Sequence, residues 1–366
     1  MKVGVLTSSR ADFGIYIPLL KILEKDSFFD LEIIAFGTHL SKNYGFTFSE
    51  IEAFNFNKTH KLHTIPASNS PEDITKAIGN TIINFSIFWS KNSYDLVFAL
   101  GDRYEMFAAV SSLSLLNAKI AHIHAGETTL GAVDNSYRHA ISLFSKYLFV
   151  STDQYKKRAE NIVEKSVEVY NVGALSIDNL KKVAYLSVED FFSKFKIDLG
   201  KPTILTTFHP ETISFTKNQE HITELLESLK FLKRKYQIII TLPNADTMGQ
   251  MIRNKISDFA KKNSEIKVIE SFGVIGYLSC MKYCKFLLGN SSSGFVEAAF
   301  FPKPVINLGN RQKGRLETEN ILTIPVNKNA ILKTVKKLEK KSSFNNCNKY
   351  GEGNTAEKII SILKKI

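Results

Sequence analysis

Short runs of β-branched and apolar residues alternate along the first half of this chain with amphipathic segments of helical length. The runs are KVGVLT, LEIIAF, DLVFAL, KIAHIH and YLFV, and segments such as IYIPLLKILEK separate them. Apolar runs of this length are typical of buried parallel strands, and helices usually connect parallel strands. The pattern therefore predicts an α/β fold with a doubly wound parallel sheet.

The same alternation begins again after about residue 180, with TILTTF, QIIITL, IKVIES, CKFLLG and KPVINL as the expected strands. Gly200 and Pro202 interrupt the chain ahead of the first of these runs. At 366 residues the chain is long enough for two domains of ordinary size. We expect one α/β domain over residues 1–180, a second over residues 181–353, and a final amphipathic helix over residues 354–366.

The charge of the chain comes mainly from lysine. The net charge is +12, and forty lysines stand against eight arginines. The lysines are spread along the sequence without the basic stripe of a nucleic-acid surface, so we expect no nucleic-acid partner. No apolar run is long enough to span a bilayer, and the N-terminal apolar segment is too short for a secretory signal, which favours a cytoplasmic protein without a membrane partner. Three cysteines, Cys280, Cys284 and Cys347, show neither CxxC nor zinc spacing.

Polar residues gather directly after six of the expected strands. The stretches SSRADFG, GDRYE and AGETTLGAVDNSYRH follow strands of the first half, and HPET, NSSSGFVEA and GNRQKGR follow strands of the second. In open parallel sheets, ligands bind outside the carboxyl ends of the strands. The loops also contain five of the eight arginines, whose planar forks suit phosphate or carboxylate: Arg10, Arg103, Arg138, Arg311 and Arg315.

The stretch NSSSGFVEA is the clearest anion site in the sequence. It places hydroxyl groups between an expected strand and an expected helix, whose free N–H groups attract phosphate. The alternative is an ordinary helix cap, with Glu297 completing a capping box. GNRQKGR could add two arginine forks to the same anion, or could be an exposed basic turn. No GxxxxGK[ST] motif occurs and SSRADFG lacks GxGxxG, so neither a P-loop enzyme nor a nicotinamide enzyme is expected.

The stretch HIHAGETTLGAVDNSYRHA holds three histidines, two carboxylates and an arginine. His122 and His124 are two residues apart, so on a strand they share one face and could bind a metal; the alternative is that they are satisfied inside the sheet. Asp134 and Arg138 have the i,i+4 spacing of a helix salt bridge. With Glu127, these residues could instead form an acid/base site, since proton transfer requires groups that take and give protons at the same place.

Two further residues fit the acid/base interpretation. Asp102 follows DLVFAL, and its alternative is a helix cap with Arg103 as a surface partner. His209 lies in FHPET, where it would join the carboxylates from the second domain. The alternative for His209 is that Pro210 simply begins a helix, with His209 at the cap.

Taken together, RADFG, GDRYE, HIHAGE, VDNSYRHA, FHPET, GNSSSGFVEA, INLGNRQKGR and GEGN resemble the hydrolysing UDP-N-acetylglucosamine 2-epimerases, which include bacterial sialic-acid and legionaminic-acid pathway enzymes. The resemblance covers nearly the whole chain in the family's order and spacing. SSRADFG differs from the GTRPE-like loop of the epimerases that keep UDP attached, and GAVDNSYRHA also resembles the hydrolysing branch. The resemblance implies a glycosyltransferase-B type fold, with two Rossmann-like domains facing a cleft and the final helix packing back on the first.

The resemblance also implies a reaction without metal or cofactor. UDP leaves by anti elimination across C1 and C2 of the sugar, and water then adds to the glycal so that C2 is inverted. UDP-N-acetylglucosamine would give UDP and N-acetylmannosamine for sialic acid-type biosynthesis. The alternatives are the same reaction on UDP-2,4-diacetamido-2,4,6-trideoxy-glucose and a glycosyltransferase of the same fold. Apart from the UDP-sugar we expect only copies of the chain as partners, in a dimer or a tetramer.

The same resemblance assigns the site residues. The catalytic residues would be Asp102, Glu127, Asp134, Arg138 and His209. Of these, Asp102, Glu127, Asp134 and His209 would handle the C2 proton, the leaving oxygen and the incoming water. The groups that bind UDP, with Glu297 on the ribose hydroxyls, are Arg10, Asn290, Ser291, Ser292, Ser293, Glu297, Arg311, Gln312 and Arg315. On this basis HIHAGE is an acid/base site, and no metal is expected there.

Overall fold

The computed structural model describes residues 1–42, 45–66, 68, 70–116, 118–213, 215–243, 249–340, 344 and 348–366. The chain forms two compact units. Unit 1 comprises Met1–Glu127, Val133–Lys181 and Lys349–Ile366, and unit 2 comprises Thr128–Ala132 and Lys182–Asn348. Cys280 and Cys284 are free and buried, and Cys347 lies outside the described residues.

Unit 1 is built on a seven-stranded sheet in the order β3-β2-β1-β4-β5-β6-β7, and all of its strand pairs are parallel. The strands are β1 (Lys2–Thr7), β2 (Asp30–Phe36), β3 (Thr59–Leu62), β4 (Leu96–Leu100), β5 (Lys119–Ile123), β6 (Tyr147–Val150) and β7 (Glu168–Asn171). The helices are α1 (Arg10–Lys25), α2 (Phe48–Glu52), α3 (Pro71–Trp89), α4 (Tyr104–Ser111), α5 (Asp134–Phe144), α6 (Asp153–Glu160), α7 (Leu175–Lys182) and α14 (Thr355–Leu363). The strand order reverses between β1 and β4, which is where ligands bind in such sheets.

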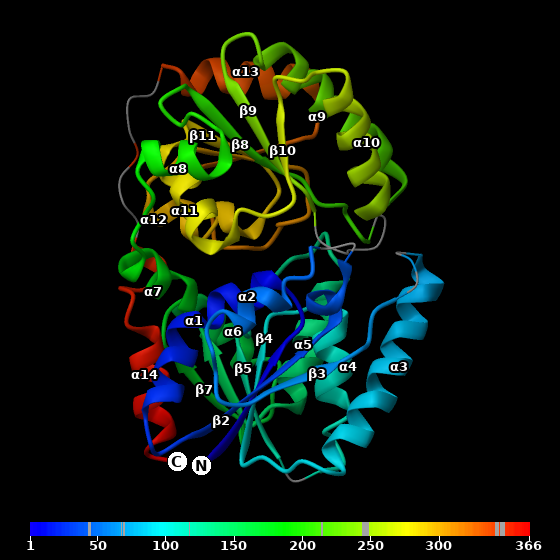
Figure 1. The fold of residues 1–366 in the computed structure, drawn as a ribbon, viewed down its shortest axis with the longest axis vertical. Coiled ribbons are helices and arrows are strands. Elements are labelled where there is room, and N and C mark those ends of the chain that lie inside the picture. The colour runs from blue at the N-terminus through cyan, green and yellow to red at the C-terminus, as the bar shows by residue number, and fades with distance from the viewer. Residues whose placement is uncertain are drawn as a thin grey trace. The chain divides into compact units, whose positions relative to one another are not determined.

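Successive residues of the unit 1 strands enter two separate cores, one on each face of the sheet. Ile33 of β2 packs in the core that includes helices α1 and α14, whereas the next residue, Ile34, packs in the core that includes α3 and α4. This is the two-residue periodicity of a strand that is buried on both sides. Helix α14 lies beside α1 (Figure 1), and its first N–H groups, those of Thr355 and Ala356, donate to the Asp178 carboxylate at 3.0 and 2.8 Å.

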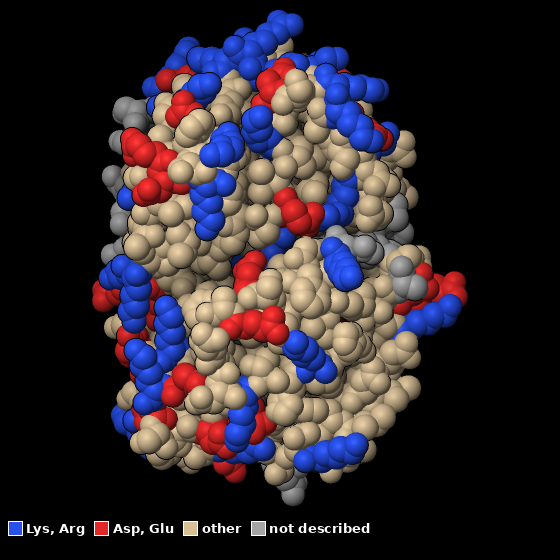
Figure 2. All heavy atoms as spheres, in the orientation of Figure 1, with Lys and Arg blue, Asp and Glu red and all other residues tan. Residues whose placement is uncertain are grey.

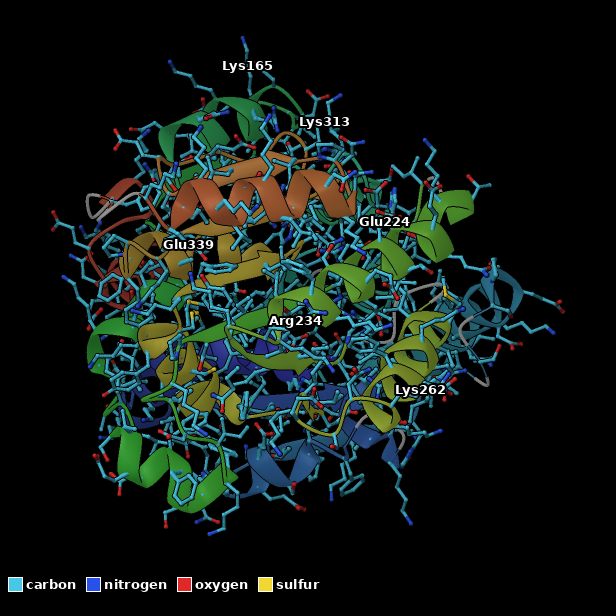
Figure 3. All side chains as sticks on the ribbon, turned by 90° about the horizontal axis from the view of Figure 1, so that it is seen from above. Lys165, Glu224, Arg234, Lys262, Lys313 and Glu339 are labelled. Carbon is cyan, nitrogen blue, oxygen red and sulfur yellow. The ribbon has the colours of Figure 1, made fainter. Side chains whose placement is uncertain are left out.

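Unit 2 is built on a six-stranded parallel sheet in the order β10-β9-β8-β11-β12-β13, which reverses between β8 and β11. The strands are β8 (Thr203–Thr207), β9 (Gln237–Thr241), β10 (Lys267–Ile269), β11 (Phe286–Gly289), β12 (Val305–Leu308) and β13 (Ile321–Ile324). The helices are α8 (Val188–Phe195), α9 (Asn218–Leu232), α10 (Gly249–Lys261), α11 (Gly273–Tyr283), α12 (Glu297–Phe300) and α13 (Lys328–Leu338). Figure 3 shows α9 and α13 side by side, where Glu224 of α9 accepts the N–H of Lys328 at 2.7 Å.

The predicted α/β architecture with two parallel sheets is confirmed. Three strands that the sequence did not indicate, β3, β7 and β13, lie at sheet edges and are less buried than the central strands, so they lack a long apolar run. Among the described residues, no helix has the length and apolar content needed to cross a membrane. On the face drawn in Figure 2, Asp and Glu lie among the Lys and Arg side chains.

Candidate active site

The six polar loops lie at the carboxyl ends of strands at, or one strand away from, the two reversals of strand order. In unit 1 they follow β1, β4 and β5, and in unit 2 they follow β8, β11 and β12. Parallel strands end at the same edge of their sheet, so each set of three loops is brought together within its own unit.

A buried arginine organises the acidic residues of unit 1. Arg138 lies on α5 and its side chain is only 2% exposed. Its Nη2 donates to the Asp102 carboxylate, and its Nη1 donates to the backbone oxygen of His124 at 2.8 Å. The same Nη1 lies 3.8 Å from Oε2 of Glu127. Asp102 and Glu127 therefore both lie beside the guanidinium of Arg138, and all three residues were predicted from the sequence. The positive charge of Arg138 offsets the repulsion between the two carboxylates.

Glu127 is held on several sides. Its Oε1 lies 2.6 Å from Nδ1 of His124 and accepts a hydrogen bond from Ser151 at 3.3 Å. The preceding residue, Gly126, has a φ of +71°, and a Cβ there would stand 2.2 Å from the backbone oxygen of Tyr155. Only glycine fits this close approach to α6, so the AGE turn fixes the position of the carboxylate that follows it.

The two histidines of HIHAGE have different environments. Both nitrogens of His122 are engaged, Nδ1 with Ser142 Oγ at 2.9 Å and Nε2 with Gly101 O at 2.7 Å. Burial lowers the pKa of His122 to about 3, so its ring is neutral. The expectation that the two histidines share a strand face is wrong, because β5 ends at Ile123 and His124 has a φ of +65°. In the described part of the chain, no three His, Cys, Asp or Glu side chains are grouped so as to hold a metal.

Asp134 and His139 lie on the same helix as Arg138. Asp134 is the first residue of α5, and Tyr137 has a pKa raised mainly by burial and further by the charge of Asp134. His139 lies 3.3 Å from the Asn135 amide, and burial together with the charge of Arg138 lowers its pKa. The i,i+4 spacing places Asp134 and Arg138 on one face of the helix.

The loop after β1 is fixed by a buried carboxylate. Asp12 accepts hydrogen bonds from the hydroxyls of Thr7 and Ser8 and from the backbone N–H groups of Ser8 and Ser9, at 2.7 to 3.0 Å. His39 lies beside it, with Nε2 3.8 Å from Oδ1. Burial alone would raise the pKa of Asp12, but the nearby His39 and the hydrogen bonds from Thr7 and Ser8 leave that pKa lowered. The half-buried Arg10 begins α1 within this ordered loop.

In unit 2 the loops after β8 and β11 are joined by Asn290. Its side-chain oxygen accepts the N–H of His209 at 2.7 Å, and its side-chain nitrogen donates to the oxygen of His209 at 2.9 Å. No helix begins at Pro210, so the alternative of a simple helix cap at His209 is wrong. Gly289 brings the two loops together, because a Cβ there would stand 2.0 Å from the backbone oxygen of Thr207.

The serine loop differs from the expected helix start. Ser291 caps a single 3-10 turn over Ser292–Gly294, and the following helix α12 has only four residues. Glu297 is the first residue of α12, so it does not complete the expected capping box. The serines are joined to each other and to Tyr277, since Ser293 Oγ lies 2.9 Å from Ser291 Oγ and 2.6 Å from Tyr277 Oη. The loop therefore carries its serine hydroxyls on a short turn, and not at the start of a long helix whose dipole would attract an anion.

The arginine loop is joined to both other loops of unit 2. Gln312 Nε2 donates to the backbone oxygen of Asn290 at 2.8 Å, and Arg311 Nη1 donates to the same oxygen at 3.4 Å. Glu211 of FHPET accepts the N–H of Asn310 at 2.8 Å. The loop is therefore not an exposed basic turn, since Gln312 is buried and Arg311 and Arg315 are half-buried.

Residues 128–132, between two expected acid/base residues, pack as part of unit 2. Leu130 donates its N–H to Lys313 O at 3.0 Å, and Gly131 O accepts the N–H of Thr212 at 3.3 Å. A Cβ on Gly131 would stand 2.4 Å from the oxygen of Asn310, so glycine permits this contact. Residues 128–132 therefore pack against the loops that contain His209 and Arg311.

Three residues of these sites were missed in the sequence: Asp12, His124 as a partner of Glu127, and Glu211. Each lies within a motif that the sequence made conspicuous, RADFG, HIHAGE or FHPET. Their common signal is an ionisable residue directly beside an expected site residue. Sequence alone did not show that these side chains bond to the loops rather than to solvent.

A family model for UDP-N-acetylglucosamine 2-epimerase matches residues 21–364. The GDP/UDP-N,N'-diacetylbacillosamine 2-epimerase (hydrolyzing) of Campylobacter jejuni is 37% identical, over 89% of this chain and 85% of that protein. Polysialic acid biosynthesis protein P7 of Escherichia coli is 35% identical, over 91% and 85%. The UDP-N,N'-diacetylbacillosamine 2-epimerase (hydrolyzing) of Legionella pneumophila is 32% identical, over 100% and 96%.

The fold is also that of a solved enzyme. The crystal structure of UDP-GlcNAc 2-epimerase from Neisseria meningitidis bound to UDP-GlcNAc matches with a TM-score of 0.83, covering 100% of both chains at 20% identity. This likeness establishes a fold of the glycosyltransferase-B type. Since the family model spans nearly the whole chain and three relatives exceed 30% identity over most of it, the chain belongs to the UDP-N-acetylglucosamine 2-epimerase family.

Proposed function

We propose that this protein is a hydrolysing UDP-sugar 2-epimerase, which converts a UDP-linked 2-acetamido sugar and water into UDP and the free sugar inverted at C2. Family membership supports a 2-epimerase, and the C. jejuni and L. pneumophila relatives are named as hydrolyzing enzymes. The observation that carries the proposal is the grouping of Asp102 and Glu127 around Arg138, at the carboxyl ends of β4 and β5.

The proposed reaction needs proton transfer at a carbon that is not acidic by itself. In the elimination, the C2 proton is removed, a double bond forms between C1 and C2, and the C1–O bond breaks with its electron pair leaving on UDP. Hydration then adds a proton to the opposite face of C2 and a hydroxyl to C1. Both steps need an acid and a base held in fixed positions. Arg138 holds the Asp102 and Glu127 carboxylates in fixed positions, so the cluster around it fits such an acid/base site.

Unit 2 has the groups expected for binding a nucleoside diphosphate. Ser291 and Ser293 carry hydroxyls in a turn after β11, and Arg311 lies against the same turn through Asn290. Arginine forks and clustered hydroxyl and N–H donors are suited to phosphate oxygens. We assign UDP binding to these residues together with Arg315, and we assign Arg10 of unit 1 to the diphosphate.

We further propose UDP-N,N'-diacetylbacillosamine, a 2,4-diacetamido-2,4,6-trideoxy sugar nucleotide, as the substrate. Its support is the names of the C. jejuni and L. pneumophila relatives, at 37% and 32% identity. UDP-N-acetylglucosamine is the second candidate, supported by the family description and by a polysialic acid biosynthesis protein at 35% identity. The two substrates differ at C4 and C6 of the sugar, and both carry the acetamido group at C2.

The test is incubation with each UDP-sugar in deuterium oxide, followed by ¹H and ³¹P NMR. We expect UDP and a free sugar that is inverted and deuterated at C2, with a higher kcat/KM for the diacetamido substrate. A product that keeps its C2 proton would rule out elimination. UDP release only in the presence of a sugar acceptor would indicate a glycosyltransferase. A higher kcat/KM for UDP-N-acetylglucosamine would exchange the two substrate assignments.

We also propose that the protein is a homo-oligomer, a dimer or a tetramer. The neighbouring helices α3, α4 and α5 leave large apolar side chains in solvent: Ile83 and Ile87 are 58% and 53% exposed, Leu115 after α4 is 95% exposed, and Leu143 is 59% exposed. Apolar groups gathered on adjacent helices are typical of an interface. Light scattering on the purified protein measures the mass, and a monomer at micromolar concentration would contradict this proposal.

A further inference from the structure

We propose that His124 is the base that removes the C2 proton, and that Glu127 is a positioning residue that acts through it. This inference rests on the proposed epimerase function and deepens it by naming the atom that takes the proton, Nε2 of His124. From the sequence, proton transfer was assigned to carboxylates and His209. For His124 the sequence offered two alternatives, a metal ligand paired with His122 or a histidine with satisfied hydrogen bonds inside the sheet. The structure places it in neither role.

The backbone of His124 has an unusual conformation. Its φ is +65°, in the left-handed region that residues with a side chain seldom adopt. A residue held in such a conformation costs free energy and persists where the surrounding structure fixes it. Here Arg138 fixes it, since Nη1 donates to the His124 oxygen at 2.8 Å, and the same guanidinium binds Asp102. The turn therefore moves the imidazole out of the strand and into the acidic cluster.

Of the two ring nitrogens of His124, Nδ1 is hydrogen-bonded within the described residues and Nε2 is not. Nδ1 lies 2.6 Å from Glu127 Oε1, and a carboxylate can only accept, so Nδ1 carries the hydrogen. In the neutral ring Nε2 then keeps its lone pair. Nε2 is buried and has no hydrogen-bond partner among the residues that the structure describes, on a side chain only 10% exposed. His122, two residues earlier, has both nitrogens satisfied, so this pattern belongs to His124 specifically.

Glu127 is in turn poorly placed to meet the sugar itself. Its side chain is 1% exposed, Oε1 is engaged by His124 and Ser151, and Oε2 lies 3.8 Å from Arg138. A carboxylate enclosed in this way orients an imidazole and stabilises the cation that forms when the ring takes a proton. In such a pair the two residues have different roles. Nε2 of His124 takes the proton, and Glu127 fixes the tautomer of the imidazole and stabilises its positive charge.

The Nε2 lone pair takes the C2 proton, and the C2–H electron pair becomes the second bond between C1 and C2. The C1–O electron pair leaves on the diphosphate of UDP. The imidazolium then gives its proton to solvent, so the proton that later reaches C2 from the opposite face comes from water through a different group.

The first test is His124→Gly, because glycine accepts the backbone conformation and leaves a cavity in the shape of the lost ring. We expect turnover to fall by roughly 100-fold or more, the range of general base catalysis, with UDP affinity changed by less than about threefold. Added imidazole should restore activity at least ~10-fold, with rescue by substituted imidazoles following their pKa values. A folded glycine variant that retains most of its turnover, or that imidazole does not rescue, would overturn the proposal.

Two further variants make the result specific. His124→Asn also tolerates the left-handed conformation and keeps a donor for Glu127, so it should fold and be as inactive as the glycine variant. An active asparagine variant would overturn the proposal even if the glycine variant failed to fold. Glu127→Gln is the matched control, since its imidazole is still present and added imidazole should not restore it. Rescue of this control would also overturn the proposal, because the effect would then not depend on a missing ring.

The outcome for the wild type separates this proposal from the proposed function. If the wild-type protein releases no UDP and exchanges no C2 proton with any UDP-sugar, the epimerase function fails. If the wild type forms the C2-deuterated product and the glycine and asparagine variants do so at similar rates, only the role of His124 fails.

Discussion

Asn290 holds both the N–H and the carbonyl of His209 through one side chain, at 2.7 and 2.9 Å. Asn290 is fully buried and His209 is 7% exposed, so these two hydrogen bonds are shielded from water. An amide is the side chain that can accept at one atom and donate at the other, as this arrangement requires. The loop that contains His209 is therefore fixed by a residue from the loop after the neighbouring strand β11.

Replacing this amide should destabilise unit 2. For Asn290→Ala we expect the free energy of unfolding to fall by about 2–4 kcal/mol, because two buried backbone groups lose their partners. Urea unfolding followed by circular dichroism measures the change. The matched control is Asn254→Ala, since Asn254 accepts only an exposed hydrogen bond from Gln250 and should change stability by less than about 0.5 kcal/mol. Equal effects in the two variants would contradict the role of the paired bonds.

Glycine at position 131 should matter for UDP binding. An alanine Cβ there would stand 2.4 Å from Asn310 O and 2.6 Å from Arg311 Cα, and both are backbone atoms that must shift. We expect Gly131→Ala to weaken UDP binding by about tenfold, measured by calorimetry, since Arg311 is displaced. The control is Gly79→Ala in α3, where a Cβ meets nothing within 4 Å and the change should stabilise by about 0.5–1 kcal/mol. Unchanged UDP affinity in Gly131→Ala would show that the loop accommodates the methyl group.

Arg311 should bind phosphate through both of its forked nitrogens. Arg311→Lys keeps the charge and loses the fork, so we expect UDP affinity to fall by roughly tenfold, and Arg311→Ala should lose more. Titration calorimetry with UDP compares the two variants. Equal affinity of the lysine, alanine and wild-type proteins would remove Arg311 from the binding site.

Asp12 should act on UDP binding through the loop that carries Arg10. In Asp12→Asn an amide group faces donors from Thr7, Ser8 and Ser9 that now receive only one acceptor oxygen. We expect a KM increase of about tenfold with a smaller change in kcat, measured from initial rates of UDP release. Lys25→Ala, at the exposed end of the same helix, should leave both constants unchanged. A loss confined to kcat would contradict a role in ordering the binding loop.

Glu32 should make the stability of unit 1 depend on acid. Burial alone would raise its pKa, but hydrogen bonds from Tyr94, His60 and Lys2 lower it to about 2. A carboxyl with a depressed folded pKa stabilises the fold above its unfolded pKa and loses that stability as the pH falls toward the folded value. We expect the free energy of unfolding of the wild type to exceed that of Glu32→Gln by about 2–3 kcal/mol at pH 7. This difference should shrink between pH 5 and pH 3.

Urea unfolding across that pH range tests the role of Glu32. Glu72→Gln is the control, because its side chain is 76% exposed and its ion pair with Lys76 lies in solvent. A Glu32 difference that stays constant with pH would show that its ionisation does not contribute.

Sequence was sufficient for the features that depend on local pattern. The runs that became β1, β4, β5, β8, β11 and β12 are apolar because they are buried on both faces, and the loops after them carry the site. It was insufficient at Ile123, where the strand ends one residue before the expected His124. Apolar periodicity does not report a left-handed turn, and the force that imposes it comes from Arg138, fourteen residues away.

The serine loop shows a second limit. Small residues followed by FVEA favour a helix start, yet the chain forms a 3-10 turn and only a four-residue helix. Phe295 and Val296 are buried there, so tertiary packing overrides the local propensity. Residues 128–132 show a third limit, because their assignment to unit 2 depends on hydrogen bonds to Thr212 and Lys313, which are distant in sequence.

Helix α14 has a consequence for the order in which the protein folds as it is made. The helix belongs to unit 1, where Ile359 and Leu363 are fully buried in the core beside α1, but the chain reaches it only after unit 2. The ribosome therefore synthesises unit 2 before the core of unit 1 has acquired helix α14. During that interval the apolar surface that α14 will cover is open to solvent and to chaperones, so the first unit to be synthesised is the last to be finished.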